Sequence, residues 1–120
     1  MTYAEKAEAA AYMSPGVRGA RVGACAVRGQ ATFTGWNSWT THPKQAHFAR
    51  NPFSIYLHAE VAAMVRAKWE VDTLVVVRIL ADGSWGLAKP CKGCQRALTN
   101  VHNVWYSTGT GHDLRHLYKL

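Results

Sequence analysis

The sequence predicts an α/β fold in which helices cover a mixed sheet. An alanine-rich stretch opens the chain, and two strand-like segments joined by a tight turn follow it. After residue 57, helix-like and strand-like segments alternate. A tight turn makes its two strands antiparallel, whereas strands separated by a helix are usually parallel. The expected order of elements is therefore α, β, β, α, β, α, β, with antiparallel and parallel pairs in one sheet.

The first helix and a hairpin are expected in the N-terminal third of the chain. Residues 3–13, YAEKAEAAAYM, are rich in alanine and uninterrupted, which predicts a helix that ends at the Ser-Pro-Gly sequence after it. Residues 22–27 and 31–36 are typical of two strands, and the Gly-Gln pair between them predicts the turn.

A segment rich in polar and aromatic residues follows, from residue 38 to residue 56. Pro43 and Pro52 argue against regular structure over most of this segment. The next helix is expected from about residue 58 to residue 69, because apolar residues recur there at helical spacing.

The C-terminal half completes the sheet. Residues 74–80, LVVVRIL, form a continuous apolar run that is typical of a strand buried on both faces. An Asp-Gly turn follows, residues 91–99 are helix-like, and residues 103–107 predict another strand. The closing sequence LRHLYKL is compatible with a short helix or with a docked tail.

Length and composition restrict the class of protein. A chain of 120 residues is expected to form a single domain, 1–120. The N-terminal stretch has no apolar core, so it is not a signal peptide, and the longest apolar run is far too short to cross a bilayer. We therefore expect a soluble, cytoplasmic protein without a membrane partner. The net charge of +7 favours anionic partners such as nucleotides or nucleic acid, although solubility alone explains such a charge equally well.

Two short motifs lie at the predicted starts of the two crossover helices. LHAEVAAM places His58 and Glu60 two residues apart, and KPCKGCQ places Cys91 and Cys94 three apart, directly after a proline. Both helices follow the sheet in the same sense, so their N-termini can meet at one edge, where the helix dipole favours thiolates. One histidine and two cysteines supply three zinc ligands and leave the fourth tetrahedral position open, as a catalytic site requires. Glu60 can then transfer protons without binding the metal.

The cysteine pair also has two other interpretations. A Cys-x-x-Cys pair can be a redox centre, but that role does not need the His-x-Glu motif. A structural zinc site would need a fourth ligand, and the other histidines of the chain show no recognisable ligand spacing. Those histidines are His42, His47, His102, His112 and His116. The two motifs together favour a catalytic zinc site.

The same residues resemble a known superfamily. His-x-Glu followed about thirty residues later by Pro-Cys-x-x-Cys is the signature of the zinc-dependent cytidine and deoxycytidylate deaminases. RVGACAVRGQATFTGWN resembles the opening hairpin of that superfamily, and GLAKPCKGCQRAL with VWYSTG resembles its later metal helix and the strand after it. The likeness covers roughly residues 17–110. It implies a three-layer α/β/α sandwich around a mixed, mainly five-stranded sheet.

The resemblance also implies a reaction. Family membership implies hydrolytic deamination with one zinc ion per chain, held by His58, Cys91 and Cys94. Zinc-activated hydroxide would attack the ring carbon that bears the amino group. Glu60 would shuttle the proton to the ring nitrogen and then to the departing ammonia.

Four further positions are candidates for binding the substrate. Asn37 matches the asparagine that binds the sugar or phosphate in relatives, although a turn residue at a strand end gives the same pattern. Ala59 and Pro90 could offer backbone groups to the base, and proline is favoured at a helix start in any case. Tyr106 could lie against the base, but an aromatic residue in a strand more often belongs to the core. Cys25, in the first strand, is expected to be a small buried residue.

The sequence of the 38–56 segment differs from that of familiar members of the superfamily. It carries Lys44 and Arg50 beside several aromatic residues, so it could be a lid that offers cations to a substrate phosphate. A solvent-exposed, partly packed loop that crosses over the sheet would have the same composition. The chain also lacks the extra ligands of those deoxycytidylate deaminases that hold a second zinc ion, since only Cys25 is left over. Allosteric regulation of their kind is therefore not expected.

Three hypotheses for the function follow. The leading one is a deaminase that converts the cytosine of a free nucleotide or nucleoside, deoxycytidylate or cytidine, to uracil with release of ammonia. The alternative is a nucleic-acid-editing deaminase acting on a transfer RNA adenosine or a single-stranded cytosine, which the positive charge and five tryptophans would suit. The third, a non-catalytic zinc module that binds nucleic acid, has no use for Glu60. The sequence shows no basic tail, second domain or long charged helix, which favours free nucleotides. Because relatives are commonly dimers to hexamers, a homo-oligomer is expected.

Overall fold

A six-stranded mixed sheet forms the centre of the molecule in the computed structural model, which describes residues 1–48 and 56–117. Five strands lie side by side in the order β2-β1-β3-β5-β6, and β4 pairs with β3 outside that path. β1 is antiparallel to β2 and β3, β3 is parallel to β5, and β6 is antiparallel to β5. The strands are β1 (Arg21–Arg28), β2 (Ala31–Trp36), β3 (Thr73–Ile79), β4 (Trp85–Gly86), β5 (Asn103–Ser107) and β6 (Leu114–His116).

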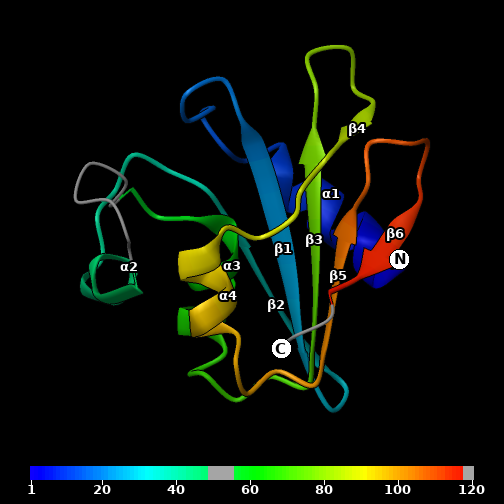
Figure 1. Cartoon of the computed structure of the whole chain (residues 1–120). Coiled ribbons are helices and arrows are strands. Elements are labelled where there is room, and N and C mark those ends of the chain that lie inside the picture. The colour runs from blue at the N-terminus through cyan, green and yellow to red at the C-terminus, as the bar shows by residue number, and fades with distance from the viewer. Residues whose placement is uncertain (49–55, 118–120) are drawn as a thin grey trace.

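Helices cover both faces of this sheet. The helices of the described chain are α1 (Tyr3–Ala11), α2 (Pro43–Phe48), α3 (Ala59–Arg66) and α4 (Lys92–Ala97). Figure 1 shows α1 on one side of the sheet and α3 with α4 on the other. The α/β/α sandwich that the sequence predicted is therefore confirmed.

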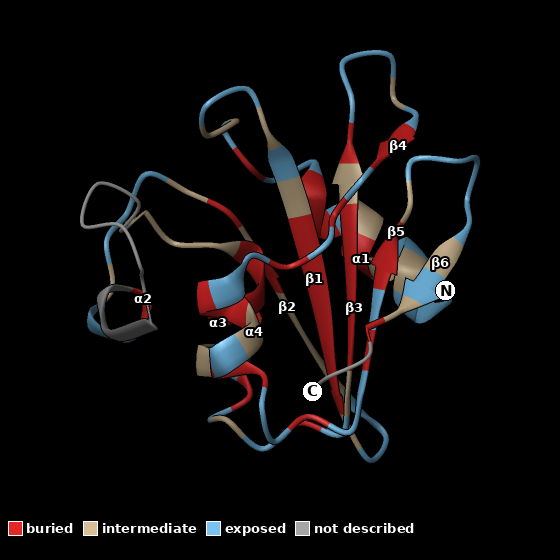
Figure 2. Ribbon diagram, viewed as in Figure 1, coloured by how far each residue is buried: buried red, intermediate tan, exposed pale blue. Residues whose placement is uncertain are grey.

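The central strand β3 shows how the sequence builds two cores. Successive residues of a strand point to opposite faces. Leu74 and Val76 accordingly pack with the α3 and α4 layer, whereas Val75 and Val77 pack with α1. All four are buried, as Figure 2 shows for the middle of β1 and β3. A strand buried on both faces is what the apolar run predicted.

Helix α3 lies unusually close to strand β2, and this contact fixes the helix that carries two of the predicted site residues. Gly35 allows the approach, because a Cβ atom added to it would lie 2.4 Å from the backbone nitrogen of Ala63. The same atom would lie 2.8 Å from the Cβ of Ala62. A side chain at position 35 would therefore push against the helix backbone.

Replacing Gly35 with alanine should lower the free energy of unfolding by about 1–3 kcal/mol, the usual range for overpacking. Urea denaturation followed by circular dichroism would measure the change. Ala31→Ser, at the exposed start of the same strand, should change the unfolding free energy by less than about 0.5 kcal/mol. A Gly35→Ala protein as stable as that control would contradict the close packing of α3 on β2.

One prediction about secondary structure was wrong, and two short elements were not predicted. The 38–56 segment contains helix α2, which starts at Pro43. Proline is tolerated in the first turn of a helix, because the amide it lacks would have no partner there. The closing sequence forms neither a helix nor a tail over Leu114–His116, which is strand β6. Strand β4 was not predicted, and it follows the expected Asp-Gly turn as the second arm of a short hairpin with β3.

None of the helices in the described part of the chain has the length and apolar composition needed to span a bilayer.

Candidate active site

Helix α3 begins at His58, which occupies the N-cap position. Its side chain makes no capping hydrogen bond, so the imidazole is available to the site. The backbone N–H of His58 instead donates to Oε1 of Gln45 in α2, at 3.0 Å. The Gln45 side chain is only 1% exposed, so α2 fixes the start of α3 from inside the protein.

Helix α4 begins at Cys91, again at the N-cap. The Cys91 sulfur accepts a hydrogen bond from the backbone N–H of Cys94 at 3.4 Å. The preceding turn is held by Gln95, whose side-chain amide donates to the carbonyl oxygen of Pro90 at 2.8 Å. Both cysteine sulfurs are thereby placed at the first turn of the helix.

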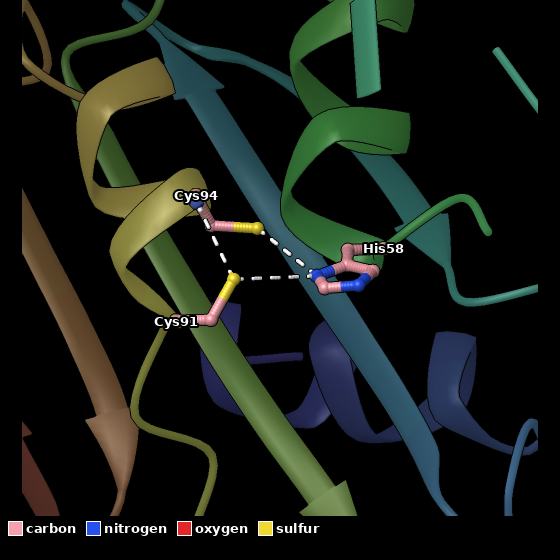
Figure 3. Close-up of side chains that lie close together, drawn as sticks. All are labelled: His58, Cys91 and Cys94. Carbon is pink, nitrogen blue, oxygen red and sulfur yellow. Dashed lines mark hydrogen bonds between the residues drawn. The ribbon is translucent and has the colours of Figure 1, made fainter. Parts of the chain in front are cut away.

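The two helix starts bring one imidazole and two sulfurs together (Figure 3). Nδ1 of His58 lies 3.2 Å from the sulfur of Cys94 and 3.7 Å from the sulfur of Cys91. The three ligand atoms all lie within 4.8 Å of one another. Zinc bonds of about 2.0 Å to nitrogen and about 2.3 Å to sulfur place tetrahedral neighbours about 3.6 Å apart, so the observed spacing fits a zinc ion.

The protonation equilibria of this group prepare one of the three ligands, Cys91, for metal binding. A hydrogen bond from the Cys94 thiol, with further help from His58, lowers the pKa of Cys91 to about 3. The hydrogen bond to Cys91 and burial raise the pKa of Cys94 above its usual value. The hydrogen bond with Cys91 raises the pKa of His58. Cys91 is thus a thiolate at neutral pH, which is the form that binds zinc.

Glu60 lies in the first turn of α3, two residues after His58, and is only 5% exposed. Burial raises the pKa of its carboxyl group above the usual value. A raised pKa makes a carboxylate a stronger proton acceptor, which is a property of residues that act in general acid–base catalysis.

A cavity of about 280 Å³ opens next to these residues. Its lining includes His58, Glu60 and Cys91, together with three cationic side chains, Arg18, Arg78 and Lys89. Apolar and aromatic side chains, among them Val22, Tyr56 and Leu87, complete the wall. Glu60 is the one carboxylate among these lining residues and the Cys91 thiolate is a second anion, so the lining carries more cations than anions.

The predicted substrate-binding residues separate into two groups. Asn37 and Ala59 line the cavity. The Asn37 side chain also holds the start of β1, because Oδ1 accepts from the Val22 N–H and Nδ2 donates to the Ala20 carbonyl, each at 2.9 Å.

Pro90 and Tyr106 are not among the residues that line this cavity. Pro90 is buried beside α4, and Tyr106 is 5% exposed within the core. The position of Tyr106 matches the core alternative that its place in a strand suggested.

One of the two predicted lid cations, Lys44, does not lie at the cavity. Lys44 is exposed on α2, and its Nζ lies 5.9 Å from the centre of the Trp69 ring. Lys44 is not part of the cavity lining. Arg50 lies outside the described residues.

Gln45, Arg18, Arg78 and Lys89 were not predicted as site residues. Gln45 reaches His58 across the fold, which no local spacing in the sequence reveals. Arg78 interrupts an apolar strand, and this charge within LVVVRIL was the one signal that could have singled it out.

The sequence matches a protein-family model described as the cytidine and deoxycytidylate deaminase zinc-binding region, over residues 1–108. The chain belongs to this deaminase family. The family's zinc-binding region and the grouping of His58, Cys91 and Cys94 together support one zinc ion per chain. Membership also identifies the protein as a hydrolytic deaminase.

Solved structures of deaminases have the same fold. The cytidine deaminase from Burkholderia pseudomallei superposes with a TM-score of 0.69 at 22% identity, covering 98% of this chain and 92% of that one. The cytidine deaminase from Mycobacterium tuberculosis gives 0.61 at 21% identity, with coverage of 95% and 86%. The dCMP deaminase from the cyanophage S-TIM5 gives 0.59 at 26% identity, with coverage of 90% and 81%. No curated protein matches the sequence.

Proposed function

We propose that this deaminase converts the cytosine base of a free nucleotide or nucleoside, of the deoxycytidylate or cytidine type, to uracil and releases ammonia. The observation that carries the proposal is the buried Glu60 carboxyl group in the same cavity as His58 and Cys91. A zinc site without a proton carrier could bind a ligand but would lack the acid–base group that hydrolysis needs.

The proposed chemistry adds water across the bond between C4 and N3 of the cytosine ring. Zinc, held by His58, Cys91 and Cys94, supplies the Lewis acid that activates water at neutral pH. The Glu60 carboxylate accepts one proton of this water and donates it to N3, while the oxygen bonds to C4. A second proton passes through Glu60 to the amino group, and cleavage of the C4–N bond then releases ammonia and leaves uracil.

The cavity supports a small substrate. Its volume of about 280 Å³ is just below the range typical of small-molecule sites, about 300–1,000 Å³. Apolar wall residues such as Val22 and Leu87 suit the face of a base. We also propose that Asn37 and the backbone at Ala59 contact the substrate, since both line this cavity.

One observation favours the alternative, a deaminase of single-stranded nucleic acid. Trp39 is 49% exposed, and its ring lies edge-on to Tyr56 with 4.8 Å between the ring centres. Tyr56 in turn lines the cavity. Exposed aromatic rings beside cationic groups are the means by which proteins stack and hold single-stranded bases.

Competition between free nucleotides and oligonucleotides separates the two proposals. We expect deoxycytidylate to be deaminated with a higher kcat/KM than a cytosine within a short single-stranded oligonucleotide. Raising the salt concentration from 50 to 200 mM should lower the nucleotide rate only modestly, since few phosphate contacts are lost. Faster turnover of the oligonucleotide, together with a loss of about a thousandfold over that salt range, would establish the alternative.

A further inference from the structure

Arg78 is a cation at the end of an otherwise apolar strand. Leu74 and Val76, four and two residues before it in β3, pack in the core beneath α3 and α4. Because strand residues alternate between faces, Arg78 points to that same side of the sheet. Its partner across the sheet is Val22 of β1, and both residues line the active-site cavity. Arg78 therefore lies in the floor of the cavity.

The surrounding strands hold Arg78 in place. Its backbone N–H donates to Oγ of the fully buried Ser107 at 3.2 Å, and Ser107 Oγ donates to the carbonyl of Gly86 at 2.6 Å. The side-chain stem runs close over Gly86, where an added Cβ would lie 3.4 Å from Cδ of Arg78. The guanidinium group thus extends from a fixed base formed by β3, β4 and β5.

The Arg78 guanidinium group lacks a partner for its Nε atom. This nitrogen is buried and makes no hydrogen bond to any residue in the described part of the chain. Over residues 1–48 and 56–117, the salt bridge present is that of Arg28 with Glu70. Arginine remains charged at any working pH, and a buried donor without an acceptor is unfavourable. An acceptor from a bound ligand would remove this cost.

The charge of the cavity indicates which acceptor fits. Arg18 and Lys89 add two further cations to the lining, and Glu60 is buried beside the metal ligands. A sugar hydroxyl or a base carbonyl would satisfy one hydrogen bond but would bring no negative charge to the Arg78 guanidinium group. A phosphate monoester carries negative charge and several acceptor oxygens that suit the geometry of arginine.

We propose that Arg78 binds the phosphate group of a nucleoside monophosphate, so that the nucleotide is preferred over the nucleoside. This inference rests on the proposed function, because it assigns the substrate class of the same cavity. It assigns the phosphate contact to a residue that lines the cavity, whereas the predicted Lys44 is not part of that lining.

The test compares the zinc-loaded wild type with Arg78→Met, which keeps the apolar stem and removes the charge. The ratio of kcat/KM for deoxycytidylate to that for deoxycytidine should be about 10–100 in the wild type, the size of one charge-assisted contact. Arg78→Met should reduce this ratio to nearly one, chiefly through KM, and Arg78→Lys should restore part of it. Arg115→Met removes one charge from an exposed position in strand β6 and should leave the ratio unchanged.

Equilibrium binding provides a readout that does not depend on turnover. Calorimetry with deoxyuridine monophosphate and deoxyuridine should show the same preference for the nucleotide, and Arg78→Met should abolish it. Equal losses for nucleotide and nucleoside in Arg78→Met or Arg78→Lys proteins that fold would overturn the phosphate contact. If the wild type deaminates neither compound, the proposed function fails, while the binding preference still decides the role of Arg78. An oligonucleotide that is bound more tightly than the mononucleotide would also overturn the proposal.

Discussion

Replacing Glu60 with glutamine should lower turnover by at least about a hundredfold, which is the lower end of the usual range for general acid–base catalysis. Glutamine keeps the shape of the side chain and can still form hydrogen bonds, but it cannot accept and return the proton of water. Zinc content and thermal stability should be retained, since Glu60 is not one of the three grouped ligands. Steady-state ammonia release and metal analysis of the same preparation would measure both effects.

A matched control comes from Glu70, whose side chain is 75% exposed in its salt bridge with Arg28. Glu70→Gln makes the same chemical change on the surface and should leave turnover within about twofold, as surface ion pairs contribute little. If Glu60→Gln retained activity within a few-fold of the wild type, Glu60 would have no place in the mechanism.

Replacing Cys91 or Cys94 with alanine should remove most of the bound zinc. The wild type should contain about one zinc ion per chain, and each substitution leaves two ligands where a catalytic zinc site has three. Activity should fall to background because the Lewis acid is lost with the metal. Atomic absorption on protein dialysed against metal-free buffer would give the zinc content.

Cys25 provides the control for the cysteine substitutions. It is fully buried on the α1 side of the sheet, away from the layer that carries α3 and α4. Cys25→Ala should therefore keep about one zinc ion per chain. Near-full zinc content after both Cys91 and Cys94 had been replaced would exclude the single site.

The elements that the sequence predicted best are those with a strong local pattern. The strands at residues 31–36 and 103–107 have the bounds that were predicted. The His-x-Glu and Pro-Cys-x-x-Cys motifs were placed at helix starts, which is where His58 and Cys91 lie. Each of these features depends on residues within a few positions of one another.

The features that were missed depend on contacts between distant parts of the chain. Strand β6 contains only three residues, and it is defined by its pairing with β5. Gln45 acts on His58 from a separate helix. The position of Arg78 relative to the cavity follows from the pairing of β3 with β1 and β4. Local sequence patterns contain no information on these partners.

Ammonia release from cytosine compounds tests the central claim most directly. Zinc-loaded protein should convert deoxycytidylate or cytidine to the matching uracil compound, with one ammonia formed per uracil. Chelation of the zinc should stop the reaction, and restoring zinc should return it. Zinc-loaded, folded protein that releases no ammonia from any cytosine nucleoside or nucleotide would contradict the account.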